Sequence, residues 1–302
     1  HIDVKPSDEG LSFTERQMLQ VAGIPANEDK GGFYFDTDYF KRLKSKWNYP
    51  FHFIDFETCT VALPFFKGMR PYESIAFQFS HHVMHENGEV EHRNQALMAE
   101  PGQFPNFEFV RKLKKSLDTD SGTIFRWAAH ENTILNQIKQ QLLTYDQTPE
   151  DCDSLIKFIE TITNDASRSM VDLNEIAVKC YFHSETQGRT SIKKVLPAVL
   201  QTSGLLKEKY SKPIGDNSSS LNFPDTFVWF QERGRKAVDP YELLKRHTIN
   251  LFNETNPSIS HENYLIAEGG AAAMAYARLQ FEELNTQERR NIEDALLRYC
   301  EL

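Results

Sequence analysis

The chain has 302 residues, of which 40% are hydrophobic and 12% aromatic, and this composition excludes an intrinsically disordered protein. Its formal net charge of −9 argues against a protein that coats nucleic acid through Lys and Arg, but not against an enzyme that holds divalent metals on carboxylates. No run approaches the roughly 18 apolar residues of a membrane span. The 4 cysteines form no CxxC pair, so we expect a reduced, cytoplasmic protein with no membrane partner.

The first part of the chain changes character near residue 46. Residues 1–45 are polar with weak periodicity, and we interpret them as a lead-in or as the end of an upstream domain. Tyr49–Glu57 is aromatic and β-prone, which predicts a central strand. A second β-prone run covers 72–86, and Asn87-Gly88, the strongest short hairpin signal, separates it from a third. We therefore predict that the first three strands form an antiparallel meander.

Helices and strands alternate in the middle of the chain. Apolar residues at helical spacing predict helices over 104–117 and from His130 onward, with a short strand over 123–128 between them. A further helix is expected over about 149–164, and a fifth short strand over 169–173.

The last third of the chain predicts an insertion followed by two helices. Loop-forming residues surround short helices such as 240–252, which indicates an insertion or cap over 205–264. Residues 269–284 and 286–302 predict the final helices. The fold class is therefore α/β, one domain over 46–302 with a mixed sheet of about five strands, flanking helices and a helical or loop insertion.

Asp55 and Glu57 carry the strongest chemical signal. Residues i and i+2 of a strand point to the same face, so both carboxylates project side by side from an otherwise apolar strand. Like charges in a buried strand stay ionised only beside cations. Mg²⁺ and Mn²⁺ prefer oxygen ligands, and two such ions about 3.5–4 Å apart can promote phosphodiester hydrolysis. The alternative is a strand end whose acids face solvent, because the tripeptide is common.

The neighbours of these acids resemble a known motif. A hydrophobic strand followed by Asp55-Phe56-Glu57-Thr58 resembles the first motif of the DEDD-type 3′-to-5′ exonucleases, which share the ribonuclease-H-like fold. The longer run Tyr49–Thr58 is similar to the bacterial domain-of-unknown-function 2779 family. Other segments carry the same likeness: Arg70-Pro71-Tyr72, 77–82, 191–197 and Asp239-Pro240-Tyr241.

The exonuclease resemblance implies further site residues. A third acid lies just inside the helix after the fourth strand, and Glu131 stands there, although the pattern has Asp and an acid also suits a helix N-terminus. Tyr299 on the last helix would orient the attacking water. An Asp four residues later would follow directly after Leu302. Asp55, Glu57 and Glu131 would then hold two divalent ions, Mg²⁺ or Mn²⁺.

Three more residues are candidates for supporting the metal ligands or contacting substrate. Asp172 follows a hydrophobic strand and is either such a supporting residue or a plain helix N-cap. His130 can reach the site or serve packing. Lys193 contacts a phosphate backbone or lies on a solvated helix face.

These residues predict a metal-dependent nuclease, a 3′-to-5′ exonuclease acting on DNA or RNA ends by a two-metal mechanism. The alternative is a catalytically weak or inactive nucleic-acid-binding or scaffold module of a larger nuclease, with fusion to further nuclease or DNA-processing domains. A carbohydrate hydrolase fits poorly, because residues i and i+2 sit roughly 6–7 Å apart in parallel orientation on one strand.

Two other clusters receive less weight. His81, His82 and His85 are spaced like zinc ligands, but His82 opposes the other two on a strand and no Cys accompanies them. A basic and aromatic group could contact nucleic acid through stacking and charge. Its members are Trp229, Phe230, Arg233, Arg235 and Lys236.

Overall fold

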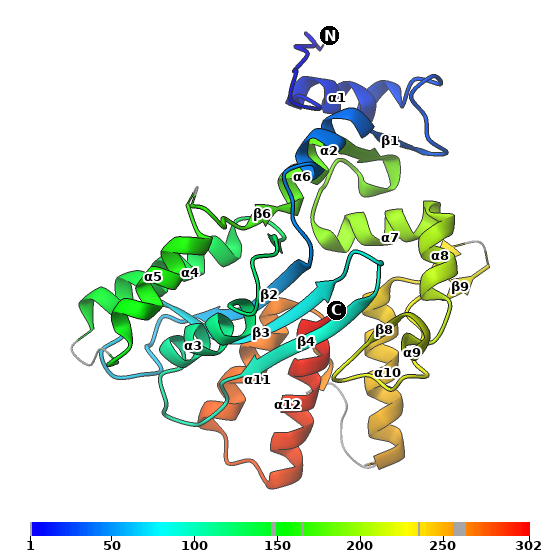
Figure 1. Cartoon of the computed structure of the whole chain (residues 1–302). Coiled ribbons are helices and arrows are strands. Elements are labelled where there is room, and N and C mark those ends of the chain that lie inside the picture. The colour runs from blue at the N-terminus through cyan, green and yellow to red at the C-terminus, as the bar shows by residue number, and fades with distance from the viewer. Residues whose placement is uncertain (1, 146–148, 165, 235, 256–263) are drawn as a thin grey trace.

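A computed structural model of the chain describes residues 2–145, 149–164, 166–234, 236–255 and 264–302. Its centre is a six-stranded mixed sheet with the strand order β6-β5-β2-β3-β4-β8 (Figure 1). These strands are β2 (Phe51–Thr60), β3 (Ser74–Met84), β4 (Val90–Leu97), β5 (Ile124–Arg126), β6 (Val171–Asp172) and β8 (Ser218–Ser219). The mixed α/β class is confirmed, with one strand more than expected.

The predicted antiparallel meander is confirmed. β2 pairs antiparallel with β3, in a register that sets Asp55 opposite Ser80, and β3 pairs antiparallel with β4. The Asn87-Gly88 turn joins β3 to β4, and Gly88 has a φ of 85°, which a residue without Cβ adopts without strain. β5 and β6 then add in parallel on the other side of β2. β2 is therefore a central strand, as predicted.

Three helices cover one face of the sheet. They are α3 (Asn106–Leu117), α4 (His130–Thr144) and α5 (Cys152–Ile162), close to the predicted positions. Their apolar residues pack with Ile54, Phe56 and Phe79 of the sheet in one buried cluster. Because alternate residues of a strand point to opposite faces, Asp55 and Glu57 point away from this cluster.

Two C-terminal helices cover the opposite face. α11 (Gly269–Phe281) and α12 (Thr286–Glu301) run side by side, orange and red in Figure 1, and confirm the two predicted final helices. The Tyr276 ring of α11 stacks on Phe77 of β3 with 4.3 Å between the ring centroids. α12 begins with a capping box formed by Asn285 and Glu288. α11 and α12 thus cover the sheet face that carries Asp55 and Glu57.

A buried chain of polar side chains joins β2, β3 and α3 on the first face. His52 Nε2 lies 2.7 Å from Asp120 Oδ1, and His52 Nδ1 lies 2.9 Å from His81 Nε2. His81 Nδ1 in turn lies 2.6 Å from Ser116 Oγ. Burial lowers the pKa of both histidines, that of His81 to about 3, so both rings are neutral near pH 7.

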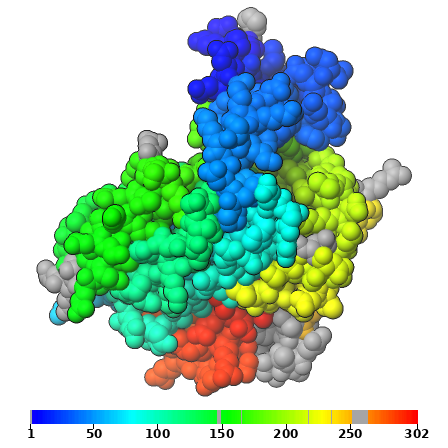
Figure 2. All heavy atoms as spheres, viewed as in Figure 1, coloured from blue at the N-terminus to red at the C-terminus, as the bar shows by residue number. Residues whose placement is uncertain are grey.

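The N-terminal segment forms its own small lobe at one end of the molecule (Figures 1 and 2). It contains α1 (Phe13–Ala22), β1 (Phe33–Phe35) and α2 (Thr37–Lys44). β1 pairs antiparallel with β7 (Tyr181–His183), which follows α6 (Leu173–Cys180). The Arg16 guanidinium donates to the Tyr181 carbonyl at 2.6 Å. Residues 1–45 therefore contact the rest of the chain through α6 and β7.

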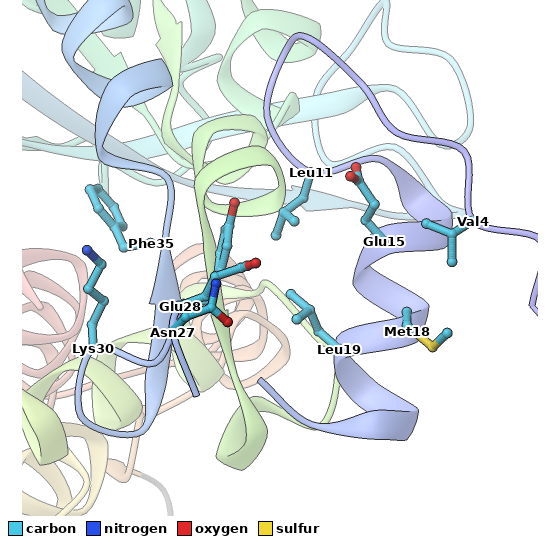
Figure 3. Close-up of a pocket in the computed structure, with 10 residues that line it drawn as sticks. Val4, Leu11, Glu15, Met18, Leu19, Asn27, Glu28, Lys30 and Phe35 are labelled. Atoms are coloured by element: carbon cyan, nitrogen blue, oxygen red, sulfur yellow. The ribbon is translucent and has the colours of Figure 1, made fainter. Parts of the chain in front are cut away.

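A pocket in this lobe lies between α1 and the segment that leads into β1 (Figure 3). Leu11 and Leu19 form apolar parts of its wall, and Glu15, Glu28 and Lys30 add charge. Its lining comes from the N-terminal segment and does not include the three acids proposed for the sheet. The pocket is therefore separate from those acids.

The region predicted as an insertion contains short elements, as expected. They are α8 (Gly204–Tyr210), α9 (Ile214–Asn217), β8, β9 (Glu232–Arg233), β10 (Lys236–Ala237) and α10 (Pro240–Thr255); η1 (Ser184–Thr186) and α7 (Ile192–Thr202) precede them. β8 pairs in parallel with β4 and supplies the sixth strand. Part of the range 205–264, namely 256–263, lies outside the described residues. Among the helices that the structure describes, none is long and apolar enough to cross a membrane.

Candidate functional site

Asp55 and Glu57 lie side by side on β2, as the strand spacing predicts. Both point to the face under α12, since Asp55 pairs with Ser80, and the Ser80 hydroxyl donates to the Cys300 carbonyl of α12 at 2.6 Å. Glu57 is 8% exposed, whereas Asp55 is open to solvent. The carboxylate pair therefore lies where the sheet face meets the end of α12.

The N-terminus of α11 approaches Glu57 closely. A Cβ at Gly269, the first residue of α11, would lie 4.0 Å from Glu57 Oε2. The partial positive charge of a helix N-terminus favours a carboxylate at this place. A Cβ at Gly270 would meet no atom within 4 Å, so this approach depends on the position of the helix end and not on the missing side chain of Gly270.

Glu131 approaches the pair from the side of β2 on which β5 lies, opposite to β3. It lies in the first turn of α4, which follows β5, as the resemblance implies. The side chain is 2% exposed, and its Oε2 has no hydrogen-bond partner. Repulsion between Asp55 and Glu131 is one cause of the raised pKa of Glu131, so the two carboxylates face a shared space. A buried carboxylate oxygen without a partner is costly unless a cation or a proton satisfies it.

A strained turn places Glu131. Ala128, just before α4, has a φ of 72°, a left-handed conformation that is uncommon for a residue with Cβ. Asp172 holds this turn: its Oδ1 accepts from Ala128 N at 3.1 Å, and its Oδ2 pairs with Arg126 at 2.8 Å. Asp172 also caps α6, so the structure assigns it the N-cap role together with a supporting role behind Glu131.

The pKa values of all three acids are raised. Desolvation is the largest cause for each, and it raises the pKa of Glu57 to about 9 and that of Glu131 to about 8. The negative charge of Asp55 adds to both shifts. The pKa of Asp55 rises least, to about 6, because a hydrogen bond from the Phe56 N–H and the charge of Lys193 oppose the effect of desolvation. The cluster therefore favours protons or cations over three free negative charges.

Lys193 is the cation that the fold brings to this cluster. Its ammonium lies 4.7 Å from the ring centroid of Tyr241 and 5.6 Å from that of Tyr299, and it donates to the Ala267 carbonyl at 2.9 Å. Its positive charge lowers the pKa of both Asp55 and Glu57, against the larger effect of desolvation. Lys193 thus lies at the acids, not on a solvated helix face.

Tyr299 reaches the acids from the last turn of α12. It is 8% exposed, and burial, followed by the charge of Glu57, raises its pKa above the usual range. The phenol is therefore protonated at neutral pH and can donate a hydrogen bond. Tyr241 lies on the other side of Lys193, and burial and the charge of Asp55 raise its pKa as well. Sequence reasoning missed Tyr241 as a site residue, although Asp239-Pro240-Tyr241 belongs to the motifs of the resemblance.

The remaining candidates lie at the margin of the cluster or away from it. His130 Nε2 lies 3.1 Å from Thr58 Oγ1 at the end of β2. In the basic and aromatic group, the Trp229 ring contacts Phe223 and Phe227, and Phe230 is buried, so these rings are engaged in packing. Arg235 lies outside the described residues.

The donors of the acid cluster fit hard divalent cations, since three carboxylates and a phenol offer only oxygen atoms. The ligand atoms of the three acids lie farther apart than those of a formed metal site. Within the described ranges, one set of three His, Cys or acidic residues offers ligand atoms within 4.8 Å of one another, and it is His82, His92 and Glu301. His81 and His85, the other members of the histidine group in the sequence, contact His52 and Glu91 instead.

The comparisons with known proteins concern the middle of the chain. Residues 52–191 match the family described as Domain of unknown function (DUF2779). The matched segment includes Asp55, Glu57 and Glu131, whereas Lys193 and Tyr299 follow it. No curated protein and no solved structure matches the chain. The comparisons therefore support the resemblance to the DUF2779 family over residues 52–191.

Proposed function

We propose that this protein is a metal-dependent nuclease with a ribonuclease-H-like fold, a 3′-to-5′ exonuclease that hydrolyses the terminal phosphodiester of DNA or RNA. The observation that carries the proposal is the convergence of Asp55, Glu57 and Glu131 from two elements on one space, with raised pKa values and an unpartnered oxygen of Glu131. Such a cluster of acids is a functional-site candidate, because burial of this kind opposes stability.

Each residue then has a distinct task. Asp55, Glu57 and Glu131 would hold two Mg²⁺ or Mn²⁺ ions, which supply an activated water and neutralise charge on the phosphate. The Tyr299 hydroxyl, which stays protonated, donates a hydrogen bond that orients the water. Lys193 offers a positive charge to a phosphate oxygen beside the acids. Asp172 keeps the turn before α4 in place through its contacts with the backbone of that turn and with β5.

One observation favours the second candidate, a catalytically weak binding or scaffold module of a larger nuclease. The carboxylate oxygens of the three acids are not within 4.8 Å of one another, in contrast to the ligand atoms of His82, His92 and Glu301, on the part of the chain that the structure describes. Glu131, which stands where the exonuclease pattern has Asp, is the residue that decides between the two candidates. A longer side chain can reach a metal directly or through water.

Degradation of labelled oligonucleotides tests the proposal. Single strands labelled at the 5′ end are incubated with Mg²⁺ or Mn²⁺ and either the 302-residue chain or a version extended past Leu302. We expect a ladder of products shortened from the 3′ end, which disappears with EDTA and in Asp55→Asn. Asp153→Asn, which changes an exposed acid on α5, is the matched control and should retain activity. Activity that persists in Asp55→Asn, or no activity in either version, would contradict the catalytic hypothesis.

A further inference from the structure

A second cluster of metal-ligand side chains lies on the same sheet face. His82 of β3 is the cross-strand partner of His92 of β4, and Glu301 lies in the last turn of α12. Figure 1 shows the C-terminal end of α12 lying over β3 and β4. His82 is also the cross-strand partner of Phe53, two residues before Asp55. The cluster is therefore separate from the acids and contains none of them.

The three side chains are already close together. His92 Nδ1 lies 3.1 Å from Glu301 Oε2, and the centroids of the His82 and His92 rings are 4.3 Å apart. One ligand atom from each residue lies within 4.8 Å of the others. Two ligands bound tetrahedrally to one Zn²⁺ at about 2.0–2.2 Å are themselves about 3.3–3.6 Å apart. The 3.1 Å between His92 Nδ1 and Glu301 Oε2, which is also the length of a hydrogen bond, is slightly shorter than this separation.

The His92 ring is not satisfied by the protein alone. It is 3% exposed, with Nδ1 at the Glu301 carboxylate, and its Nε2 has no hydrogen-bond partner. A neutral imidazole has one donor and one acceptor nitrogen. If Nδ1 carries the proton, the lone pair of Nε2 is buried without a donor. If Nε2 carries it, the N–H is buried without an acceptor, and Nδ1, which accepts from the Leu221 backbone N–H at 3.4 Å, faces a carboxylate oxygen. A cation at the cluster removes one of these two defects.

Neighbouring groups prepare the cluster for a cation. Asn222 Nδ2 donates to Glu301 Oε2 at 2.7 Å, and hydrogen-bonded support of this type accompanies ligating carboxylates. Neutral imidazole and carboxylate are the ligand forms that zinc needs.

We propose that His82, His92 and Glu301 bind one transition-metal ion of the Zn²⁺ class, with a water in the fourth position. The two imidazole rings are stacked with an interplanar angle of 19°, so their in-plane lone pairs do not converge until the His82 ring turns. His82 is the less buried of the two histidines and is the one that turns. The bound ion ties the end of α12 to β3 and β4, and does so whether or not the acids catalyse hydrolysis.

Zn²⁺ binding measured by titration calorimetry tests this site. The protein is titrated with ZnCl₂ in the Asp55→Asn/Glu57→Gln background, which weakens the acid cluster as a competing site. We expect one strong site in this background. His82→Ala should weaken its affinity by more than about 100-fold, because loss of an outer-shell partner alone costs about 10–100-fold. Asn222→Ala should fall within that smaller range.

Two controls separate metal binding from effects on folding. His85→Ala removes a partly exposed histidine at the end of the same strand and should leave the affinity unchanged. His82→Ala breaks no hydrogen bond between His92 and Glu301 but removes a ring that stacks on His92, so its thermal unfolding without metal is measured to confirm that the variant is folded. No strong Zn²⁺ site in the background protein, or unchanged affinity in His82→Ala, would overturn the proposal. Cobalt(II) gives an independent readout, since a four-coordinate site produces a visible absorption band that His82→Ala should abolish.

Discussion

Replacement of Glu131 by Gln should stabilise the metal-free protein at neutral pH. The carboxyl is 2% exposed, lies near Asp55 and has an oxygen without a partner, so its charged form is disfavoured in the folded state. The glutamine side chain has nearly the same shape as that of glutamate and carries no charge. The substitution thus removes a cost that the native protein bears in the absence of metal.

The pH dependence of this effect follows from the direction of the pKa shift. Burial raises the pKa of Glu131 from 4.5 to about 8, so between these values the folded state binds more protons than the unfolded state. The stability of the native protein therefore falls as pH rises from 4.5 through about 8, relative to the variant. A shift of this size corresponds to roughly 5 kcal/mol at about 1.4 kcal/mol per pKa unit. Because Asp55 shares the repulsion, we expect about 2–4 kcal/mol at pH 8 and a difference near zero at pH 4.5.

Urea unfolding followed by circular dichroism at several pH values measures the difference. EDTA keeps the protein metal-free in one series, and Mn²⁺ is added in the other. Mn²⁺ should restore the stability of the native protein at pH 8 and have a smaller effect on Glu131→Gln. Glu86→Gln, in the exposed turn after β3, serves as the control and should show no such trend. A pH-independent difference between Glu131→Gln and the native protein would refute the argument.

Three further outcomes are expected. Lys193→Met removes the positive charge that lowers the pKa of Asp55 and Glu57, so the apparent pKa of metal-free Asp55 should rise in an NMR titration. Asn106→Ala leaves the buried Ala76 N–H without its acceptor at 2.8 Å and removes the donor at 2.9 Å from the Ser74 carbonyl, which keeps Gln141 Nε2 at 3.4 Å. This variant should lower the free energy of unfolding by about 2–4 kcal/mol in urea. Tyr299→Phe should slow nucleotide release by at least about 10-fold without changing the thermal midpoint, because it removes the donor to water and keeps the buried ring; equal rates would contradict the role of the hydroxyl.

The parts of the fold set by local patterns could be predicted from the sequence. The alternation in β2 and β3 and the Asn87-Gly88 turn are properties of neighbouring residues, and they predict the meander. β8 consists of Ser218 and Ser219, which have no strand pattern and pair only because the insertion lies at the free edge of β4. Pairing of β1 with β7 depends on segments about 150 residues apart in sequence, and no local signal announces it.

Some residues of the candidate site could likewise be predicted from local sequence patterns, and others could not. Asp55 and Glu57 follow from strand geometry, and Glu131 from its position after a strand. Tyr241 could not be predicted as a neighbour of Lys193, because helices from distant parts of the chain bring the two together. From the histidine spacing around β3, we considered His81, His82 and His85 together as possible zinc ligands. The partners of His82 instead come from β4 and α12, which only the tertiary fold brings into contact.

The hydrogen bonds of the buried polar series through His52 and His81 all donate in the same direction along the series. The Asp120 carboxylate can only accept, so His52 carries its proton on Nε2 and accepts on Nδ1 from His81, which in turn accepts from Ser116. A slip of one residue between β2 and β3 would send His52 to the opposite face and break its bonds to His81 and Asp120. These hydrogen bonds therefore favour one pairing register of β2 with β3. In that register, the paired acids of β2 face α12 and not the apolar core.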